Sequence, residues 1–124
     1  MGDAVRLPEP DVSSLDLVTV LGALADRWRI AAVRALDGVK EAVYCGQLRE
    51  EAGFNIAKST VSHHMRVLRE AGVTRTYLVG ARRYTYLRRD DLNARFPGLL
   101  DAILAEPGPV AYTIPADADV LTFS

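Results

Sequence analysis

The spacing of apolar residues changes along the chain and predicts four successive helices. Residues 15–25 are apolar on nearly all sides, which is typical of a helix that is covered on more than one face. A stripe of apolar residues three to four positions apart predicts a second helix that starts after Asp26 and ends at Gly38. A short helix over residues 45–52 and a longer one over residues 58–71 follow.

The predicted helix over residues 58–71 has one apolar stripe and one polar face. Val61, Met65 and Leu68 recur at helical spacing and form the stripe. We expect Ser59 to cap the helix and Gly72 to end it. The side chains left off the stripe are small and polar or basic: Lys58, Ser59, Ser62, His63 and Arg66.

After this helix the apolar period changes to two, which predicts a β-hairpin. Runs of strand-forming residues at 73–79 and 83–88 flank a turn over residues 80–82. A final helical region begins near residue 90. Pro97 interrupts that region, and we expect a new helix to start there, because proline suits a first helical position and not an interior one.

These elements predict one domain, residues 14–106, between two tails. A chain of 124 residues is short for two independent cores. Residues 1–13 hold acids and prolines without periodicity, so we expect a mobile N-terminal tail, with Ser13 or Ser14 capping the first helix. Residues 107–124 are expected to form a C-terminal tail that packs on the body or on a partner.

Composition narrows the class of protein. Apolar residues make up 49% and charged residues 25%, which is ordinary for a globular domain. No apolar run approaches the roughly 20 residues of a membrane helix, and no signal-peptide pattern is visible. The single cysteine, Cys45, cannot form an internal disulfide. We therefore expect a cytoplasmic protein without a membrane partner.

The net charge of −1 hides a basic middle segment between acidic ends. Residues 27–89, which we call the basic middle segment, hold thirteen Lys and Arg against five Asp and Glu. The remaining residues hold two basic and eleven acidic side chains. Such local asymmetry is what a DNA-binding face requires, although a charge run alone is more often a solvated surface.

A short helix followed by a basic, Ser/Thr-rich helix is the helix–turn–helix arrangement, in which the second helix enters the DNA major groove. The helical residues that we expect to contact DNA are Lys58, Ser59, Thr60, Ser62, His63, His64, Arg66 and Arg69. Arg82 and Arg83, at the hairpin tip, suit a wing that contacts phosphates or a narrow minor groove.

Residues 59–72, Ser-Thr-Val-Ser-His-His-Met-Arg-Val-Leu-Arg-Glu-Ala-Gly, resemble the signature of the ArsR/SmtB-type winged helix–turn–helix regulators. Residues 24–30 are similar to the start of that family's second helix, and residues 80–87 to its wing. The resemblance covers about residues 15–104. It implies a mainly α fold with a small β-hairpin, in the order α-α-α-α-β-β-α, that dimerises through its first and last helices. It also implies a bacterial repressor that an effector releases from DNA.

The metal sites of that family are not matched here. Its Cys-x-Cys pair falls on Tyr44 and Gly46, and no histidine follows His64. We therefore expect no metal and no cofactor. Three alternatives then remain for the effector. It is a small organic molecule in a dimer-interface pocket, which the first helix, Trp28 and the last helix could line; or the signal is oxidation of Cys45; or there is no effector.

Several of these residues also have ordinary structural interpretations. For His64, packing with a hydrogen bond to a phosphate or the backbone is favoured over a base contact, whereas His63 points elsewhere and is favoured for DNA. Trp28 is expected in the core or an interface. For Cys45, a small buried apolar side chain is favoured over a redox switch.

Two classes of function remain open. The leading hypothesis is a homodimeric, sequence-specific repressor that binds a palindromic DNA operator. The alternative is a winged-helix protein-interaction module, a co-regulator with weak or no DNA binding of its own. An enzyme is disfavoured, because the sequence holds no phosphate loop, metal cluster or nucleophile beside a base.

Overall fold

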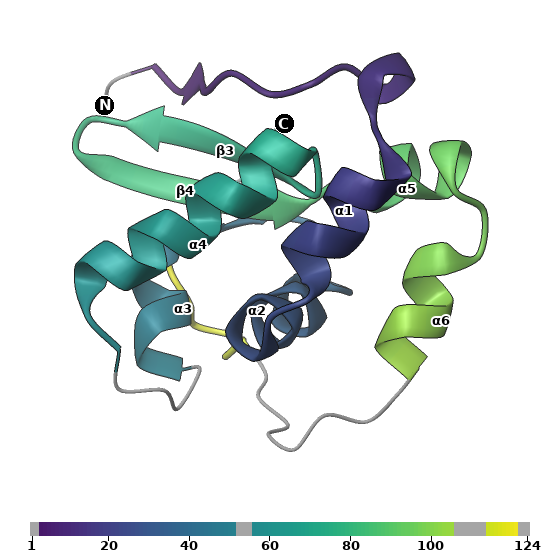
Figure 1. The fold of residues 1–124 in the computed structure, drawn as a ribbon. Coiled ribbons are helices and arrows are strands. Elements are labelled where there is room, and N and C mark those ends of the chain that lie inside the picture. The colour runs from purple at the N-terminus through teal and green to yellow at the C-terminus, as the bar shows by residue number, and fades with distance from the viewer. Residues whose placement is uncertain (1–2, 52–55, 106–113, 122–124) are drawn as a thin grey trace.

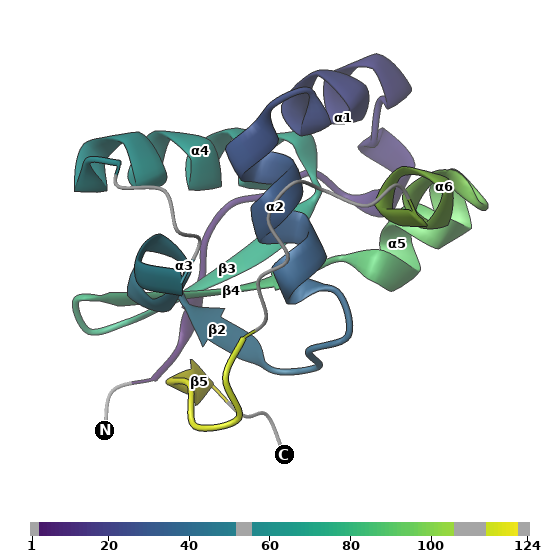
Figure 2. The ribbon, with the colours of Figure 1, turned by 90° about the horizontal axis from the view of Figure 1, so that it is seen from below.

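The computed structural model describes residues 3–51, 56–105 and 114–121. In these ranges α2, α3 and α4 lie on one side of an antiparallel sheet, while α1, α5 and α6 gather toward the end where β4 leads into α5 (Figures 1 and 2). The elements in chain order are β1 (Val5–Arg6), the 3-10 helix η1 (Val12–Ser14), α1 (Leu17–Leu24), α2 (Arg27–Leu36), β2 (Ala42–Tyr44), α3 (Cys45–Glu51), α4 (Lys58–Ala71), β3 (Thr74–Val79), β4 (Arg82–Leu87), α5 (Arg89–Arg95), α6 (Leu99–Ala105) and β5 (Val120–Leu121).

Aspartates begin the first two helices. The Asp16 carboxylate accepts a hydrogen bond from the backbone N–H of Thr19 at 3.0 Å, so Asp16 caps α1. The expectation of a serine cap was wrong, because Ser13 and Ser14 lie in η1 and the extended Leu15 then inserts into the core. Helix α2 starts after Asp26 as predicted, and the Asp26 carboxylate caps it.

Helix α4 packs through the predicted stripe. Val61, Met65, Leu68 and Ala71 are buried against the core, and α4 contacts α1, α2 and β3. Gly72 ends the helix with a φ of 87°, a conformation that glycine adopts without steric cost. Ser59 is not the cap: it lies inside the helix, which begins at Lys58 after Ala57, and Ala57 makes no side-chain capping bond.

The predicted hairpin is confirmed. Strands β3 and β4 pair in register from Thr74 with Leu87 to Val79 with Arg82. The connecting turn is therefore Gly80-Ala81, and Gly80 has a positive φ of 59°, as a tight hairpin turn requires. The hairpin places Arg82 and Arg83 at the start of β4, next to its turn.

Three further strands extend the hairpin to a five-stranded sheet in the order β1-β3-β4-β2-β5. The segments predicted as tails contribute its two edges, since β1 pairs with β3 and β5 pairs with β2. These edge strands have two residues each, too few to show a period of two in the sequence.

The final helical region is broken near the predicted proline. Helix α5 ends at Arg95, and α6 begins at Leu99, two residues after Pro97, because Gly98 adopts a φ of 82° between them. The predicted boundary between the domain and the C-terminal tail, at residues 106 and 107, lies outside the described residues.

The fold is therefore a winged helix–turn–helix, as the sequence predicted, with a larger sheet than a single hairpin. Helices α3 and α4 form the helix–turn–helix pair, and the β3–β4 hairpin is the wing.

Candidate nucleic-acid interface

The polar face of α4 lies opposite its buried stripe and is open to solvent. Exposed side chains cover the first half of the helix and continue into its second half: Lys58, Ser59, Thr60, Ser62, His63 and Arg66. Arg69, nearer the C-terminal end, is partly buried. Neither Lys58 nor Arg66 has an ion-pair partner among the described residues, so both charges remain available to an anion outside the chain.

His64 is held against α2 and does not share the exposed face. Its ring stacks on that of Trp28, with centroids 5.1 Å apart and planes 13° apart. The Arg29 guanidinium donates a hydrogen bond to His64 Nδ1 at 2.9 Å, and the Asp26 carboxylate lies 4.0 Å from the same nitrogen. Because Nδ1 accepts this bond, the neutral ring carries its proton on Nε2.

Burial against Trp28 lowers the pKa of His64, and the neighbouring Arg29 and His63 add to this effect, while Asp26 opposes it. His64 thus packs against α2, as its structural interpretation expected. Its hydrogen-bond partner, however, is the side chain of Arg29 and not the backbone or a phosphate. Trp28 lies in the core, as predicted.

The two wing arginines differ in their surroundings. The Arg82 guanidinium forms an ion pair with Asp119, and it lies 4.5 Å from the centre of the Tyr44 ring. Tyr84 donates a hydrogen bond to the same Asp119 carboxylate at 3.1 Å. Arg83 is exposed and has no ion-pair partner within the described ranges.

Cys45 begins α3 and packs against the core. Burial raises the pKa of its thiol to about 12, although nearby Arg83 works in the opposite direction. The thiolate is the reactive form of cysteine, so the thiol that the structure places here is poorly suited to a redox switch at neutral pH.

The sequence did not reveal the residues that hold His64 and Arg82, which are Arg29 and Asp119. Arg29 and Asp119 each lie more than thirty positions from the residue they bond, and no periodicity relates them. Tyr44 was considered only as the match to a missing metal ligand. The one signal in the sequence was collective, since acids concentrate outside the basic middle segment.

Comparisons with known proteins give a family. A family model described as "Helix-turn-helix domain" matches residues 24–77, which run from the end of α1 into the wing. The chain is also 36% identical over 84 residues to the uncharacterized HTH-type transcriptional regulator YceK of Bacillus subtilis (strain 168), over 68% of this chain and 82% of that protein. The chain belongs to the helix–turn–helix transcriptional regulators.

As a member of this family the protein is a DNA-binding transcriptional regulator, in which α4 is the second helix of the helix–turn–helix and the β3–β4 hairpin is the wing. In the part of the chain that the structure describes, no three His, Cys, Asp or Glu side chains gather in a way that could hold a metal ion. None of the described helices is long and apolar enough to span a membrane.

The contacts of His64 predict a pH-dependent contribution to stability. Because folding lowers the pKa of His64 below its usual 6.5, the unfolded chain binds this proton more readily. The contribution of the neutral His64 ring to the free energy of unfolding is fully present above pH 6.5. It is lost as the pH falls from that value to the lower pKa of the folded state. His64→Asn, which keeps an acceptor for Arg29 but cannot take up a proton, should show a smaller loss of unfolding free energy between pH 7.5 and pH 5.

Urea denaturation at the two pH values measures this loss, with His63→Asn, on the exposed face, as the matched control. Equal pH dependence of His64→Asn and the wild-type protein would contradict the assignment.

Proposed function

We propose that the protein is an ArsR/SmtB-type repressor that binds a palindromic operator as a homodimer and is released by an effector other than a metal ion. The observation that carries this proposal is the exposed polar face of α4. It combines small hydroxyl side chains with two cations that are unpaired among the described residues, and it stands beside a wing with two arginines.

The arrangement fits a major groove about 12 Å wide. With 14 residues, α4 is about 21 Å long, so its first half can lie along base edges while its second half rests on the body. In this placement Arg66 is positioned for a base, and Ser59, Ser62 and His63 for bases or the adjoining backbone. The remaining contacts, to phosphates, fall to Lys58, Thr60, Arg69, Arg82 and Arg83.

An apolar surface on α1 supports the homodimer. Leu17, Val18 and Leu21 are exposed, and Val18 keeps 75% of its surface in the monomer. Their helix borders a narrow apolar groove between α1 and α5–α6, lined by Val20, Leu24, Leu92, Leu99, Leu100 and Ile103. A second copy related by a two-fold axis would cover this surface and repeat α4 on the next turn of DNA.

The dimer predicts a change of mass in one variant. Val18→Asp places a charge in the proposed interface and should convert the protein from twice 13.6 kDa to a 13.6 kDa monomer in sedimentation equilibrium. Val5→Asp, at another exposed apolar residue in β1, should leave the dimer intact. A wild-type protein of 13.6 kDa at all concentrations would contradict the interface.

Arg66 provides the test of the recognition helix. DNA selected from a random pool should be palindromic, and Arg66→Ala should weaken binding to it by about 1–3 kcal/mol and relax the preference at one base position. Fluorescence anisotropy measures both, and Lys40→Ala, which removes an exposed charge away from α4, is the control.

Unchanged affinity and preference in Arg66→Ala would contradict this placement of α4. Failure to select any sequence, together with a stoichiometric protein partner, would instead favour the co-regulator hypothesis.

The ion pair between Arg82 and Asp119 predicts that, when the wing binds DNA, a phosphate replaces the Asp119 carboxylate at Arg82. The ion pair is exposed, and exposed pairs contribute only about 0–1 kcal/mol. Asp119→Asn should therefore tighten DNA binding by up to about fivefold and steepen the salt dependence by up to about 0.9 in log–log slope.

Asp117→Asn removes the same charge from the same segment and forms the matched control, since Asp117 has no ion pair within the described residues. In an Arg82→Gln background, Asp119→Asn should have no effect of its own. Identical salt slopes for the two single variants would contradict the exchange while leaving DNA binding itself untouched.

A further inference from the structure

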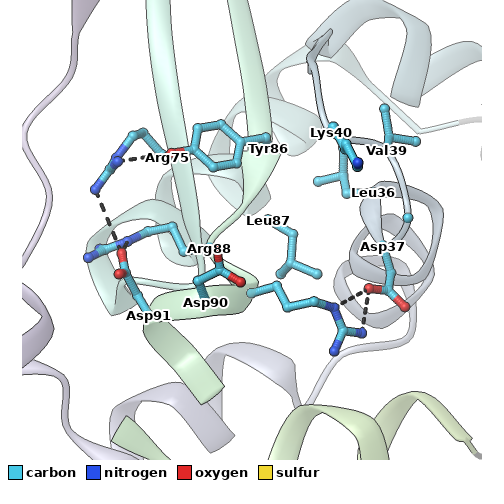
Figure 3. A pocket seen from close by; sticks show the side chains of 12 residues that line it. Leu36, Asp37, Val39, Lys40, Arg75, Tyr86, Leu87, Arg88, Asp90 and Asp91 are labelled. Atoms are coloured by element: carbon cyan, nitrogen blue, oxygen red, sulfur yellow. Dashed lines mark hydrogen bonds and ion pairs between the residues drawn. The ribbon is translucent and has the colours of Figure 1, made fainter. Parts of the chain in front are cut away.

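A cleft of about 790 Å³ opens between the loop that follows α2 and the base of the wing (Figure 3). Its walls come from residues 36–40, from Arg75 on β3, and from residues 86–91 at the junction of β4 and α5. This volume falls in the range of about 300–1,000 Å³ that small-molecule sites occupy. By contrast, the groove between α1 and α5–α6, near the setting expected from the sequence, holds only about 10 Å³.

One part of the cleft is apolar. Leu36 and Leu87 are buried core residues that reach its inner surface, and Val39 lies beside them. The Tyr86 ring forms a wall, and its hydroxyl is turned toward Arg75, from which it accepts a hydrogen bond at 2.9 Å (Figure 3). An apolar group can therefore be covered here without burying an unpaired polar atom.

Most of the ionic groups in the cleft are already committed. Arg88 donates hydrogen bonds to Asp91 at 2.9 Å and to the carbonyl of Pro10 at 2.8 Å, and Arg89 donates to Asp37 at 2.7 Å. Ion pairs within the described chain hold five of the seven ionic side chains of the lining: Asp37, Arg75, Arg88, Arg89 and Asp91. A ligand would have to break these pairs in order to use them.

The two ionic side chains that remain have opposite signs. Lys40, in the loop after α2, and Asp90, in the first turn of α5, have no ion-pair partner among the described residues. Figure 3 shows them on different sides of Leu87. A ligand with a single charge would engage only one of them, whereas a ligand with both charges engages both across the apolar surface.

We propose that this cleft is the effector site of the regulator and that it takes a small zwitterion whose two charges stand at opposite ends of an apolar chain, of the kind represented by an ω-amino acid. The ligand carboxylate faces Lys40, its ammonium group faces Asp90, and its apolar body lies on Leu36, Leu87 and Tyr86. This inference rests on the proposed function, since it names the class of effector that the repressor would require.

Regulation by an effector requires that its site be coupled to the dimer surface and to the DNA-binding wing, and residues of the cleft contact both regions. Arg89 bridges Asp37 in the cleft to Asp101 of α6, with 2.7 Å to each carboxylate, and α6 borders the proposed dimer surface. Tyr86 and Arg75 belong to the wing itself. An occupant that favours one arrangement of this junction shifts the balance between DNA-bound and free forms.

Isothermal titration of the full chain without DNA tests the site directly. 6-Aminohexanoate and 8-aminooctanoate should bind. Glycine lacks the apolar chain, hexanoate lacks the ammonium group and hexylamine lacks the carboxylate, so each should bind at least about tenfold more weakly than 6-aminohexanoate. Absence of binding by both ω-amino acids overturns the proposal, and so does equal binding of hexanoate.

Variants then locate the binding. Lys40→Gln and Asp90→Asn should each weaken 6-aminohexanoate binding by about tenfold or more, because each leaves one ligand charge unpaired. Arg27→Gln and Asp117→Asn, which remove exposed charges elsewhere, should not change it. Binding that survives both cleft variants lies at another place and overturns the assignment.

A final measurement separates this inference from the function on which it rests. 6-Aminohexanoate should weaken binding to the selected operator, and Lys40→Gln should bind that DNA normally but lose the response. Binding of 6-aminohexanoate without any change in DNA affinity overturns the effector role. If the chain selects no DNA at all, the proposed function fails while the titration still reports whether the cleft holds a zwitterion.

Discussion

Acidic side chains from outside the basic middle segment pair with arginines of the wing and its base, and this pairing decides which cations of the molecule remain free. Arg75 meets Glu9, Arg82 meets Asp119, Arg88 meets Asp91, and Arg89 meets Asp101. Together these contacts tie the N-terminal segment, the C-terminal segment and the α5–α6 region to the hairpin. The cations of α4 have no such partners in the described ranges, so their charges remain available to an anion outside the chain.

The position of α4 depends on packing as well as charge. Its apolar stripe rests on the core, and His64 stacks on Trp28 with Arg29 closing the contact. Two independent contacts on one side of the helix fix its rotation about its own axis. The opposite side, which includes His63 and Arg66, is thereby directed to solvent. A recognition helix needs this fixed rotation, because a base contact depends on which side chains reach the groove.

The sequence predicted those parts of the fold that repeat. Helices α2 and α4, the buried stripe of Val61, Met65 and Leu68, and the β3–β4 hairpin follow from spacings of three to four or of two. The edge strands β1 and β5 did not, since two residues carry no period. The exposed polar face of α4 was equally predictable from the sequence. The bonds made by Asp119 and Arg29 were not, because a bond between residues far apart in the chain exists only after the topology brings them together.

The same logic explains why a net charge of −1 does not argue against a nucleic-acid partner. The side chain of Arg88 is only 1% exposed and bonds to Asp91 and to the carbonyl of Pro10, so its charge stabilises the fold and is not available to a ligand. Arg82, at 56%, is paired with an acid that is itself exposed, so water competes with that pair and the pair costs little to break. The flanking acids therefore act in two ways. Those at the base of the wing hold the architecture, while Asp119 forms an exposed pair with Arg82 that a DNA phosphate would replace in the binding we propose. The capacity of such a face to bind an anion therefore depends on which of its ion pairs can exchange, and the net charge does not report this.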